Sequence, residues 1–360
     1  MIYFISFIVV LGIPVFLHEL GHFLAAKSVG IKVEKFYVGF DFFNLGIKKK
    51  YKDTEYGIGL FPLGGYVKVA GILDENMDLN TKGQDFEFRS KNVFQKVWFL
   101  SAGVIMNFIL AIFVFTCFTL FQGHPEVIDR PIIDEVFEEF PANFIGLKKD
   151  DEILSIDNTS IKTFSELQEI VNSNLDNSIN IEWIRKNGDE YQTFNSAITP
   201  VKQEKFEKGK IVEIGIIGIR PYYDIIDANL FESIFHGVAQ TVWWTKHISY
   251  SILALISGEI SMNELSGPLG IAQIAGETAS SGGLYSLIGL MAIISINLGI
   301  INIIPLPVVD GGHVLIAIIE GIIRREIPIK IKYFIQVFGT LFLLFLFIFV
   351  FANDIYKLFK

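Results

Sequence analysis

The spacing of four long, nearly uncharged runs constrains the fold of this chain more than any other feature. Residues 1–26, 97–121, 284–304 and 334–352 are apolar, and most of the charged residues lie between them. Each run holds about 20 residues, which is enough for a helix to cross the hydrocarbon core of a bilayer. The runs predict an α-helical polytopic membrane protein with about four transmembrane helices, and they exclude a soluble protein with an ordinary buried core.

The segments between the runs differ in character and predict the domain organisation. Residues 31–71 mix β-branched and aromatic residues with turn residues, which favours strands, whereas residues 72–92 are polar. We expect a first span at 1–30, a β loop and polar linker at 31–92, a second span at 93–121, one inserted α+β domain at 122–200, a linker with an interfacial helix at 201–283, a third span at 284–325, and a fourth span with the C-terminus at 326–360.

The segment that follows the second span is acidic. Residues 122–230 hold 11 Lys and Arg against 21 Asp and Glu, which is a net charge of −10 in a chain whose total is −9. We interpret it as an exposed domain, and its charge argues against a nucleic-acid partner, which requires a basic face. It is predicted to contain strands at 132–136, 151–156, 178–186 and 191–198 and a helix at 164–172.

Basic residues predict the orientation of the chain in the membrane. Residues 27–96 hold 12 Lys and Arg, and the short loop between the last two spans holds another four. Because loops rich in Lys and Arg stay in the cytoplasm, we expect both loops there and the acidic domain outside. Trp243 and Trp244 favour a membrane interface for a helix at 231–257, although the sequence leaves open whether this helix spans.

A metal-binding motif lies inside the first span. His18-Glu19-Leu20-Gly21-His22 has the H-E-x-x-H pattern, which on a helix places both imidazoles on one face. Glu19 can then accept a proton from water whose pKa a zinc ion lowers to roughly 7. A chance match is the alternative, but ionisable groups inside a span are costly unless they have partners.

Two histidines leave a catalytic zinc one protein ligand short. Asp310 is the only carboxylate between Glu277 and Glu320, and it follows two prolines that break the helix of the third span. Asp310 could instead cap the helix that follows, an ordinary role for Asp. His313 is a rival ligand, which we rank below Asp310 and expect to act as a neighbour of the ligands. The single cysteine, Cys117, excludes a cysteine-rich zinc site.

Taken together, these motifs resemble one known family. HELGH (His18–His22), FPLGGYVKVAG (Phe61–Gly71), AGVIMNFILA (Ala102–Ala111), SGPLGIAQIAG (Ser266–Gly276) and NIIPLPVVDGGH (Asn302–His313) are similar to motifs of the site-2 proteases, in particular the bacterial regulator of sigma-E type. The resemblance extends over nearly the whole chain. It implies a zinc metalloendopeptidase with Zn²⁺ as cofactor, His18, His22 and Asp310 as ligands and Glu19 as general base.

The same resemblance implies further roles. Asn302 would hold the substrate or polarise its carbonyl, although a buried Asn that bonds a neighbouring helix is the plainer interpretation. Gly64, Gly65 and Tyr66 would guide the substrate as an added strand within a membrane-reentrant β-hairpin loop; a tight structural turn is the alternative. PANFIGLKKDDEILSIDNTSI, residues 141–161, resembles part of a PDZ domain.

The resemblance also implies a setting and a substrate class. We expect a multi-pass protein of the bacterial inner membrane, with its active site toward the cytoplasm and the PDZ-like domain outside. Its partners would be the lipid bilayer and single-span membrane proteins already cut by another protease, such as anti-sigma factors or remnant signal peptides. Two rivals remain: a non-enzymatic membrane adaptor with a structural metal, for which Glu19 would have no use, and a metal transporter, which requires more polar residues along the spans.

Overall fold

A computed structural model defines the fold. It describes every residue except 42–45, 60, 72–83, 189, 208–209 and 360. The chain divides into two compact units. The first comprises residues 1–118, 230–249 and 260–360, and the second comprises residues 119–229 and 250–259.

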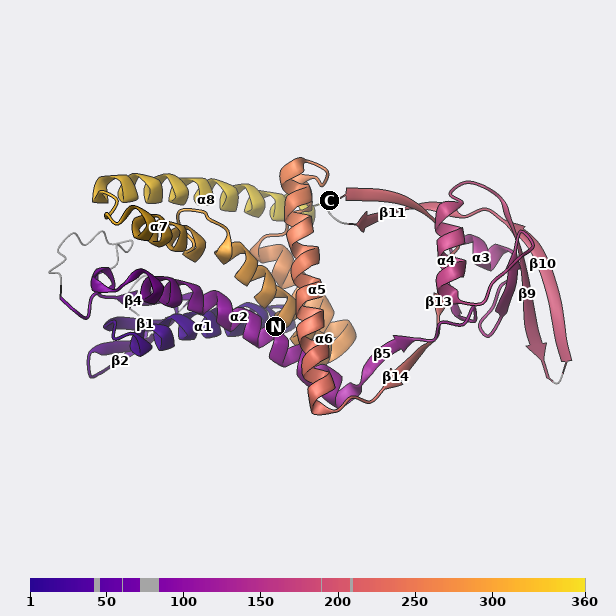
Figure 1. Cartoon of the computed structure of the whole chain (residues 1–360), viewed down its shortest axis with the longest axis horizontal. Coiled ribbons are helices and arrows are strands. Elements are labelled where there is room, and N and C mark those ends of the chain that lie inside the picture. Colours follow the sequence, from indigo (N-terminus) through magenta and orange to yellow (C-terminus); the bar gives the residue numbers. More distant parts are fainter. Residues whose placement is uncertain (42–45, 60, 72–83, 189, 208–209, 360) are drawn as a thin grey trace. The chain divides into compact units, whose positions relative to one another are not determined.

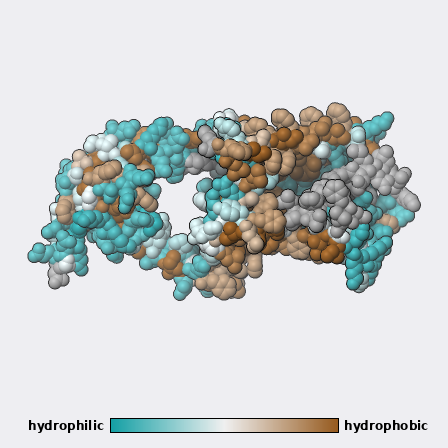
Figure 2. All heavy atoms as spheres, turned by 180° about the vertical axis from the view of Figure 1, so that it is seen from behind, coloured by the Kyte–Doolittle hydropathy of each residue, from teal (hydrophilic) through white to brown (hydrophobic). Residues whose placement is uncertain are grey.

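Four long apolar helices lie where the sequence predicted the spans. They are α1 (Ile2–Ser28), α2 (Val93–Gln122), α6 (Pro268–Ile303) and α8 (Ile329–Leu358), and each is long and apolar enough to cross a membrane (Figure 1). Many of their large apolar side chains point outward, and the surface over these helices is largely hydrophobic (Figure 2). Such surfaces are stable when lipid rather than water surrounds them.

Close helix contacts position the N-terminal motif. Gly21 of α1 lies against the backbone carbonyl of Ala102 in α2, where any side chain would collide with it. α1 also packs along α6. Small residues of this kind let membrane helices approach closely, and the approach brings the polar face of α1 to both neighbouring helices.

The third predicted span is longer than expected and is kinked. α6 begins at Pro268, and Gly283 interrupts it with φ of 66°, a conformation that glycine adopts without strain. The helix ends at Ile303, Pro305 and Pro307 follow, and α7 (Asp310–Ile323) begins after this break. The sequence predicted the break and the helix beyond it, but it placed the start of the span near residue 284.

Another long helix and a helix cap complete the helical elements. The segment whose location the sequence left open forms one helix, α5 (Leu230–Ser257), which does not belong to the four candidate spans found among the described residues. The buried carboxylate of Asp354 in α8 accepts hydrogen bonds from the backbone amides of Gly267, Leu269 and Gly270 at 2.9–3.0 Å. α8 therefore caps the N-terminus of α6. Short 3-10 turns are η1 (Phe88–Ser90) and η2 (Met262–Glu264).

Residues that follow α1 form a four-stranded sheet in place of a simple hairpin. The strands are β1 (Val33–Phe40), β2 (Ile47–Tyr51), β3 (Thr54–Ile58) and β4 (Phe61–Val69), in the order β2-β3-β1-β4. β1 runs parallel to β3 and antiparallel to β4. Within the described sheet, β4 is therefore an edge strand, and it contacts α1.

The second unit is an α+β fold with its own core. Its main sheet has the order β10-β9-β7-β8, and strands from its two ends pair as β6 with β13 and β5 with β14. These last pairs extend the unit past the predicted boundary at residue 200. Its elements are β5 (His124–Val127), β6 (Ile133–Val136), α3 (Pro141–Phe144), β7 (Glu152–Ile156), β8 (Thr159–Ser160), α4 (Phe164–Ser173), β9 (Ile179–Asn187), β10 (Glu190–Ile198), β11 (Val201–Glu207), β12 (Lys210–Ile216), β13 (Ile219–Pro221) and β14 (Tyr223–Ile226).

Apolar residues hold this unit together. Alternate residues of β9, namely Ile179, Ile181 and Trp183, are at most 3% exposed, as expected for a strand with one face in a core. They pack with buried residues of α4, including Leu167 and Val171. On the face that Figure 2 shows, the surface of this unit is mostly hydrophilic.

Candidate metal centre

His18 and His22 face the interior from one side of α1. They are four residues apart, which is about one helical turn, and each is 7% exposed. Their Nε2 atoms lie 3.2 Å apart. The spacing seen in the sequence therefore places two imidazole nitrogens at one point among α1, α2 and α6.

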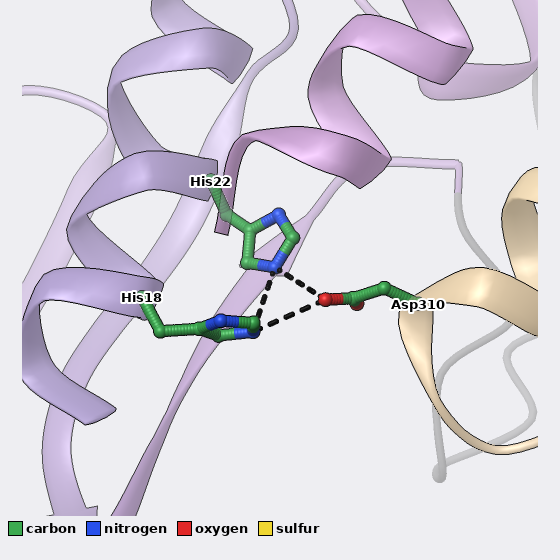
Figure 3. Close-up of side chains that lie close together, drawn as sticks. All are labelled: His18, His22 and Asp310. Atoms are coloured by element: carbon green, nitrogen blue, oxygen red, sulfur yellow. Dashed lines mark hydrogen bonds and ion pairs between the residues drawn. The ribbon is translucent and has the colours of Figure 1, made fainter. Parts of the chain in front are cut away.

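Asp310 reaches the same point from the other end of the chain. Its Oδ2 atom lies 3.1 Å from Nε2 of His18 and 3.2 Å from Nε2 of His22 (Figure 3). α7 begins at Asp310, and its N-cap is Val309. Asp310 is thus the first residue of α7 rather than its cap, and its carboxylate is turned toward the two histidines.

The donor set fits a zinc ion. Among the described residues, these three form a group whose potential ligand atoms all lie within 4.8 Å of one another. Zn–N and Zn–O bonds of about 2.0–2.1 Å in a tetrahedron would separate the ligand atoms by about 3.3 Å. The observed separations of 3.1–3.2 Å are close to that value. Two nitrogens and one carboxylate oxygen also leave a fourth position for water or substrate, as catalytic zinc sites do.

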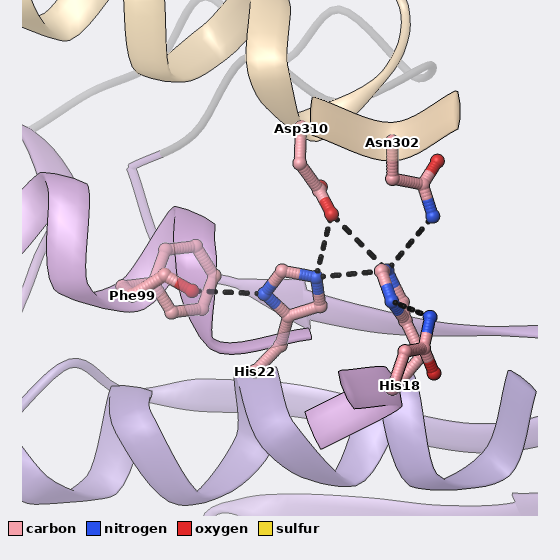
Figure 4. A network of polar contacts seen from close by, with 6 residues as sticks. His18, His22, Phe99, Asn302 and Asp310 are labelled. Atoms are coloured by element: carbon pink, nitrogen blue, oxygen red, sulfur yellow. Dashed lines mark hydrogen bonds and ion pairs between the residues drawn. The ribbon is translucent and has the colours of Figure 1, made fainter. Parts of the chain in front are cut away.

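Neighbouring groups orient both imidazoles. Nδ1 of His22 lies 2.9 Å from the backbone carbonyl oxygen of Phe99 in α2 (Figure 4). Nδ1 of His18 lies 3.2 Å from Nδ2 of Asn107, which is also in α2 and fully buried. Contacts of this kind to the second ring nitrogen are typical of metal-binding histidines.

Glu19 lies beside the histidines on α1, half-buried and next to β4. A Cβ atom added at Gly65 of β4 would lie only 3.1 Å from Cγ of Glu19. The absence of a side chain at residue 65 therefore lets the edge strand approach the carboxylate. Gly64 and Tyr66, the other two residues predicted to guide the substrate, flank Gly65. Gly64 has φ of 106°, and the ring of Tyr66 stacks on that of Tyr37 with centroids 5.1 Å apart.

Asn302 lies at the same centre, in the last turn of α6. Its Nδ2 atom is 3.5 Å from Nε2 of His18, and the residue is half-buried (Figure 4).

His313, the rival ligand, does not lie at this point. It lines a cavity of about 60 Å³ together with Pro307, Glu320 and Lys332, and it is not in the group formed by the three ligand candidates.

Two contributors to the centre were not identified from the sequence. Asn107 had a signal, because it is an amide within the uncharged run 97–121, where polar residues need a partner. The backbone carbonyl of Phe99 had no such signal in the sequence, since every residue has a backbone carbonyl. Gly103 lies between them, and a Cβ atom there would lie 2.7 Å from Nε2 of His18.

The chain is similar to known proteins over nearly its whole length. The model of peptidase family M50 matches residues 6–346. The zinc metalloprotease RasP of Geobacillus kaustophilus is 31% identical, over 99% of this chain and 98% of its own. A putative zinc metalloprotease of Campylobacter jejuni is 32% identical over 99% of this chain and 94% of its own. The probable protease eep of Enterococcus faecalis is 30% identical over 99% of this chain and 99% of its own. This chain therefore belongs to peptidase family M50, the site-2 protease family.

Proposed function

We propose that this zinc metalloprotease hydrolyses a peptide bond within a transmembrane helix of a membrane substrate. One observation carries the proposal: the three ligand atoms of His18, His22 and Asp310 meet within 3.2 Å of one another between helices apolar enough to span a membrane. A substrate that reaches these residues must approach through the same apolar surroundings. A single membrane-spanning segment meets that requirement.

His18, His22 and Asp310 would hold the metal. A bound zinc ion supplies Lewis acidity, which polarises a carbonyl and lowers the pKa of water to roughly 7. The carboxylate of Asp310 offsets part of the metal's positive charge, and the buried imidazoles exclude bulk water from one side of the centre. The remaining work falls to residues next to the ligands.

Glu19 has the position of a general base. It is adjacent to His18 in sequence and half-buried, so its carboxylate can accept a proton from the attacking water and deliver it to the leaving amine. Asn302 has the position of a donor to the substrate. Its Nδ2 atom lies 3.5 Å from Nε2 of His18, close enough to the centre to hydrogen-bond the scissile carbonyl.

β4 is suited to hold the substrate in an extended form. It is an edge strand of the described sheet, and its Gly65 lies against Glu19. Helical backbone resists hydrolysis because its carbonyls are already bonded, whereas a substrate strand added along Gly64, Gly65 and Tyr66 would present an open carbonyl. We propose that this sheet is the membrane-reentrant β loop expected from the sequence.

The surroundings follow from the same argument. We propose a location in the bacterial inner membrane, with the metal centre toward the cytoplasm, because the basic loops favour that side. The substrates would be single-span proteins already shortened by another protease, such as anti-sigma factors or remnant signal peptides.

We propose a PDZ-like role for the second unit. A cavity of about 360 Å³ lies there between α4 and residues 216–219, and it is lined by Phe140, Leu167 and Val171.

Replacement of Glu19 by Gln tests the mechanism. The variant keeps the shape of the side chain and loses its basicity, so the purified full chain should retain zinc while cleavage of a labelled single-span peptide falls by roughly 10²- to 10⁴-fold. Zinc content is measured by elemental analysis, and the cut position by mass spectrometry. The matched variant His22→Ala should lose both zinc and cleavage.

Three results would contradict the proposal. Cleavage retained by Glu19→Gln would remove the base role, and zinc retained at full occupancy by His22→Ala would remove the metal site. Cuts found only outside the apolar stretch of the substrate would remove intramembrane hydrolysis while leaving the metal centre intact.

A further inference from the structure

The two histidines of the metal centre have different partners at their outer nitrogens. Nδ1 of His22 lies 2.9 Å from the backbone carbonyl of Phe99, which only accepts hydrogen bonds. His22 must therefore donate from Nδ1, and in the neutral ring this leaves the lone pair on Nε2. That lone pair faces Asp310 and His18, as a metal ligand requires.

His18 meets an amide instead of a carbonyl. Its Nδ1 atom lies 3.2 Å from Nδ2 of Asn107, and Oδ1 of Asn107 is buried and finds no hydrogen-bond partner among the described residues. If Nδ2 donated, Nδ1 of His18 would accept, and the proton of the neutral ring would lie on Nε2. Nε2 would then have no lone pair for a metal.

Reversal of the amide removes this conflict. The two ends of an Asn side chain have the same shape, and a half-turn about Cβ–Cγ exchanges them. Oδ1 would then accept a hydrogen bond from Nδ1–H of His18. The reversal breaks no hydrogen bond of Oδ1, because Oδ1 in its present position makes no hydrogen bond with the described residues.

The position of Asn107 is itself held firmly. Asn107 is fully buried in α2, and the hydroxyl of Ser295 in α6 donates a hydrogen bond of 2.9 Å to its backbone carbonyl. α2 and α6 are thus joined at the residue that contacts His18. An amide anchored in this way can fix the ring of His18 in one orientation and one tautomer.

We propose that Asn107 is a positioning residue of the metal centre: its side-chain carbonyl accepts a hydrogen bond from Nδ1–H of His18 and keeps the lone pair of Nε2 directed at the metal. The inference rests on the proposed metal site. Both histidines would then donate from Nδ1: His18 to the side-chain carbonyl of Asn107, and His22 to the backbone carbonyl of Phe99.

Two substitutions separate this role from simple packing. Asn107→Leu has a similar volume and no acceptor, so the full chain in detergent should bind zinc about 10- to 100-fold more weakly in competition with a chromophoric chelator. Asn107→Asp keeps an acceptor and loses the amide donor, so its zinc affinity should remain close to that of the wild type. Ser295→Ala is the matched control: it removes the hydrogen bond to the backbone carbonyl of Asn107 and leaves the side-chain amide beside His18, so it should weaken zinc binding much less than Asn107→Leu does.

Nitrogen NMR of histidine-labelled, zinc-loaded protein reads the tautomer directly. The signal of His18, identified by its loss in His18→Gln, should show the Nδ1–H form in the wild type and in Asn107→Asp. The Nε2–H form in the wild type would overturn the proposal without any variant of Asn107. So would weak zinc binding by Asn107→Asp, wild-type binding by Asn107→Leu, or equal weakening by Ser295→Ala. Failure of the wild type to bind zinc would instead refute the metal site itself.

Discussion

At the scale of single residues, the proposed metal centre depends on a missing side chain as well as on its three proposed ligands. Gly103 of α2 faces the imidazoles, and an added Cβ atom would lie 2.7 Å from both Nε2 and Cε1 of His18. Such distances are shorter than van der Waals contact. The rings and a methyl group cannot occupy this space together unless α2 or the histidines move.

Gly103→Ala should therefore weaken zinc binding by about tenfold or more, because it displaces the ligand nitrogens. Gly12→Ala is the control on α1, since its Cβ atom would meet only Cγ2 of Ile8 at 3.7 Å, an ordinary contact. Zinc affinity is measured by chelator competition on both purified variants. Wild-type affinity in Gly103→Ala would show that the histidines do not need the position they have in this structure.

At the scale of elements, β4 connects the sheet to the helix that carries the motif. A Cβ atom at Gly65 would lie 2.7 Å from the backbone oxygen of Tyr37 in β1 and 3.1 Å from Cγ of Glu19. The strand thus lies between a neighbouring strand and the proposed base with no room for a side chain. A substrate added along β4 would be held at a distance from the centre that this glycine sets.

Gly65→Ala should lower kcat/KM for a single-span peptide by roughly 10- to 100-fold, because a shift of β4 by a fraction of an ångström misplaces the substrate carbonyl. Zinc content should stay at the wild-type level, since Gly65 contacts Glu19 rather than the three ligands. Cleavage kinetics and elemental analysis on the same preparation test both statements. Unchanged kinetics would argue against β4 as the substrate strand, and zinc loss would point to a wider collapse.

At the scale of the whole molecule, each of the two compact units has its own core and polar anchors. In the second unit, Asp151 is fully buried, and Arg185 binds both of its carboxylate oxygens at 2.7 Å. This pairing raises the pKa of Arg185. The backbone amide of Lys148 also donates to Asp151, so the carboxylate links β9 to the turn before β7.

Arg185→Met should destabilise the second unit by about 3 kcal/mol, because it leaves the buried carboxylate of Asp151 without its cation. Lys202→Met is the control: its ion pair with Glu213 is about half exposed on both sides, and its loss should cost less than about 1 kcal/mol. Pulse proteolysis of the full chain in urea reports each unfolding midpoint by the fragments released. Equal midpoints for the two variants would contradict the structural role of the buried pair.

Much of this architecture could be predicted because it depends on local patterns. Uncharged runs of about 20 residues located the four long helices. Strand and turn residues located β6, β7, α4, β9 and β10 of the second unit but missed its shorter strands and the strands that pair its two ends. The i, i+4 spacing placed His18 and His22 on one face, and the break at Pro305 and Pro307 singled out Asp310. The hairpin expected after α1 is a four-stranded sheet, because alternation predicts strands but not their partners.

The sequence by itself determined which residue types are available for a metal and which segments require an apolar environment, because both follow from chemistry within one turn or one span. Only the tertiary structure decided that Asp310, 288 residues from His22 in the chain, lies at the same point as the histidines. It alone also selected Asn107 and the Phe99 carbonyl as their partners. Those choices depend on how closely α1, α2 and α6 approach one another, and that approach is a property of packing rather than of any local pattern.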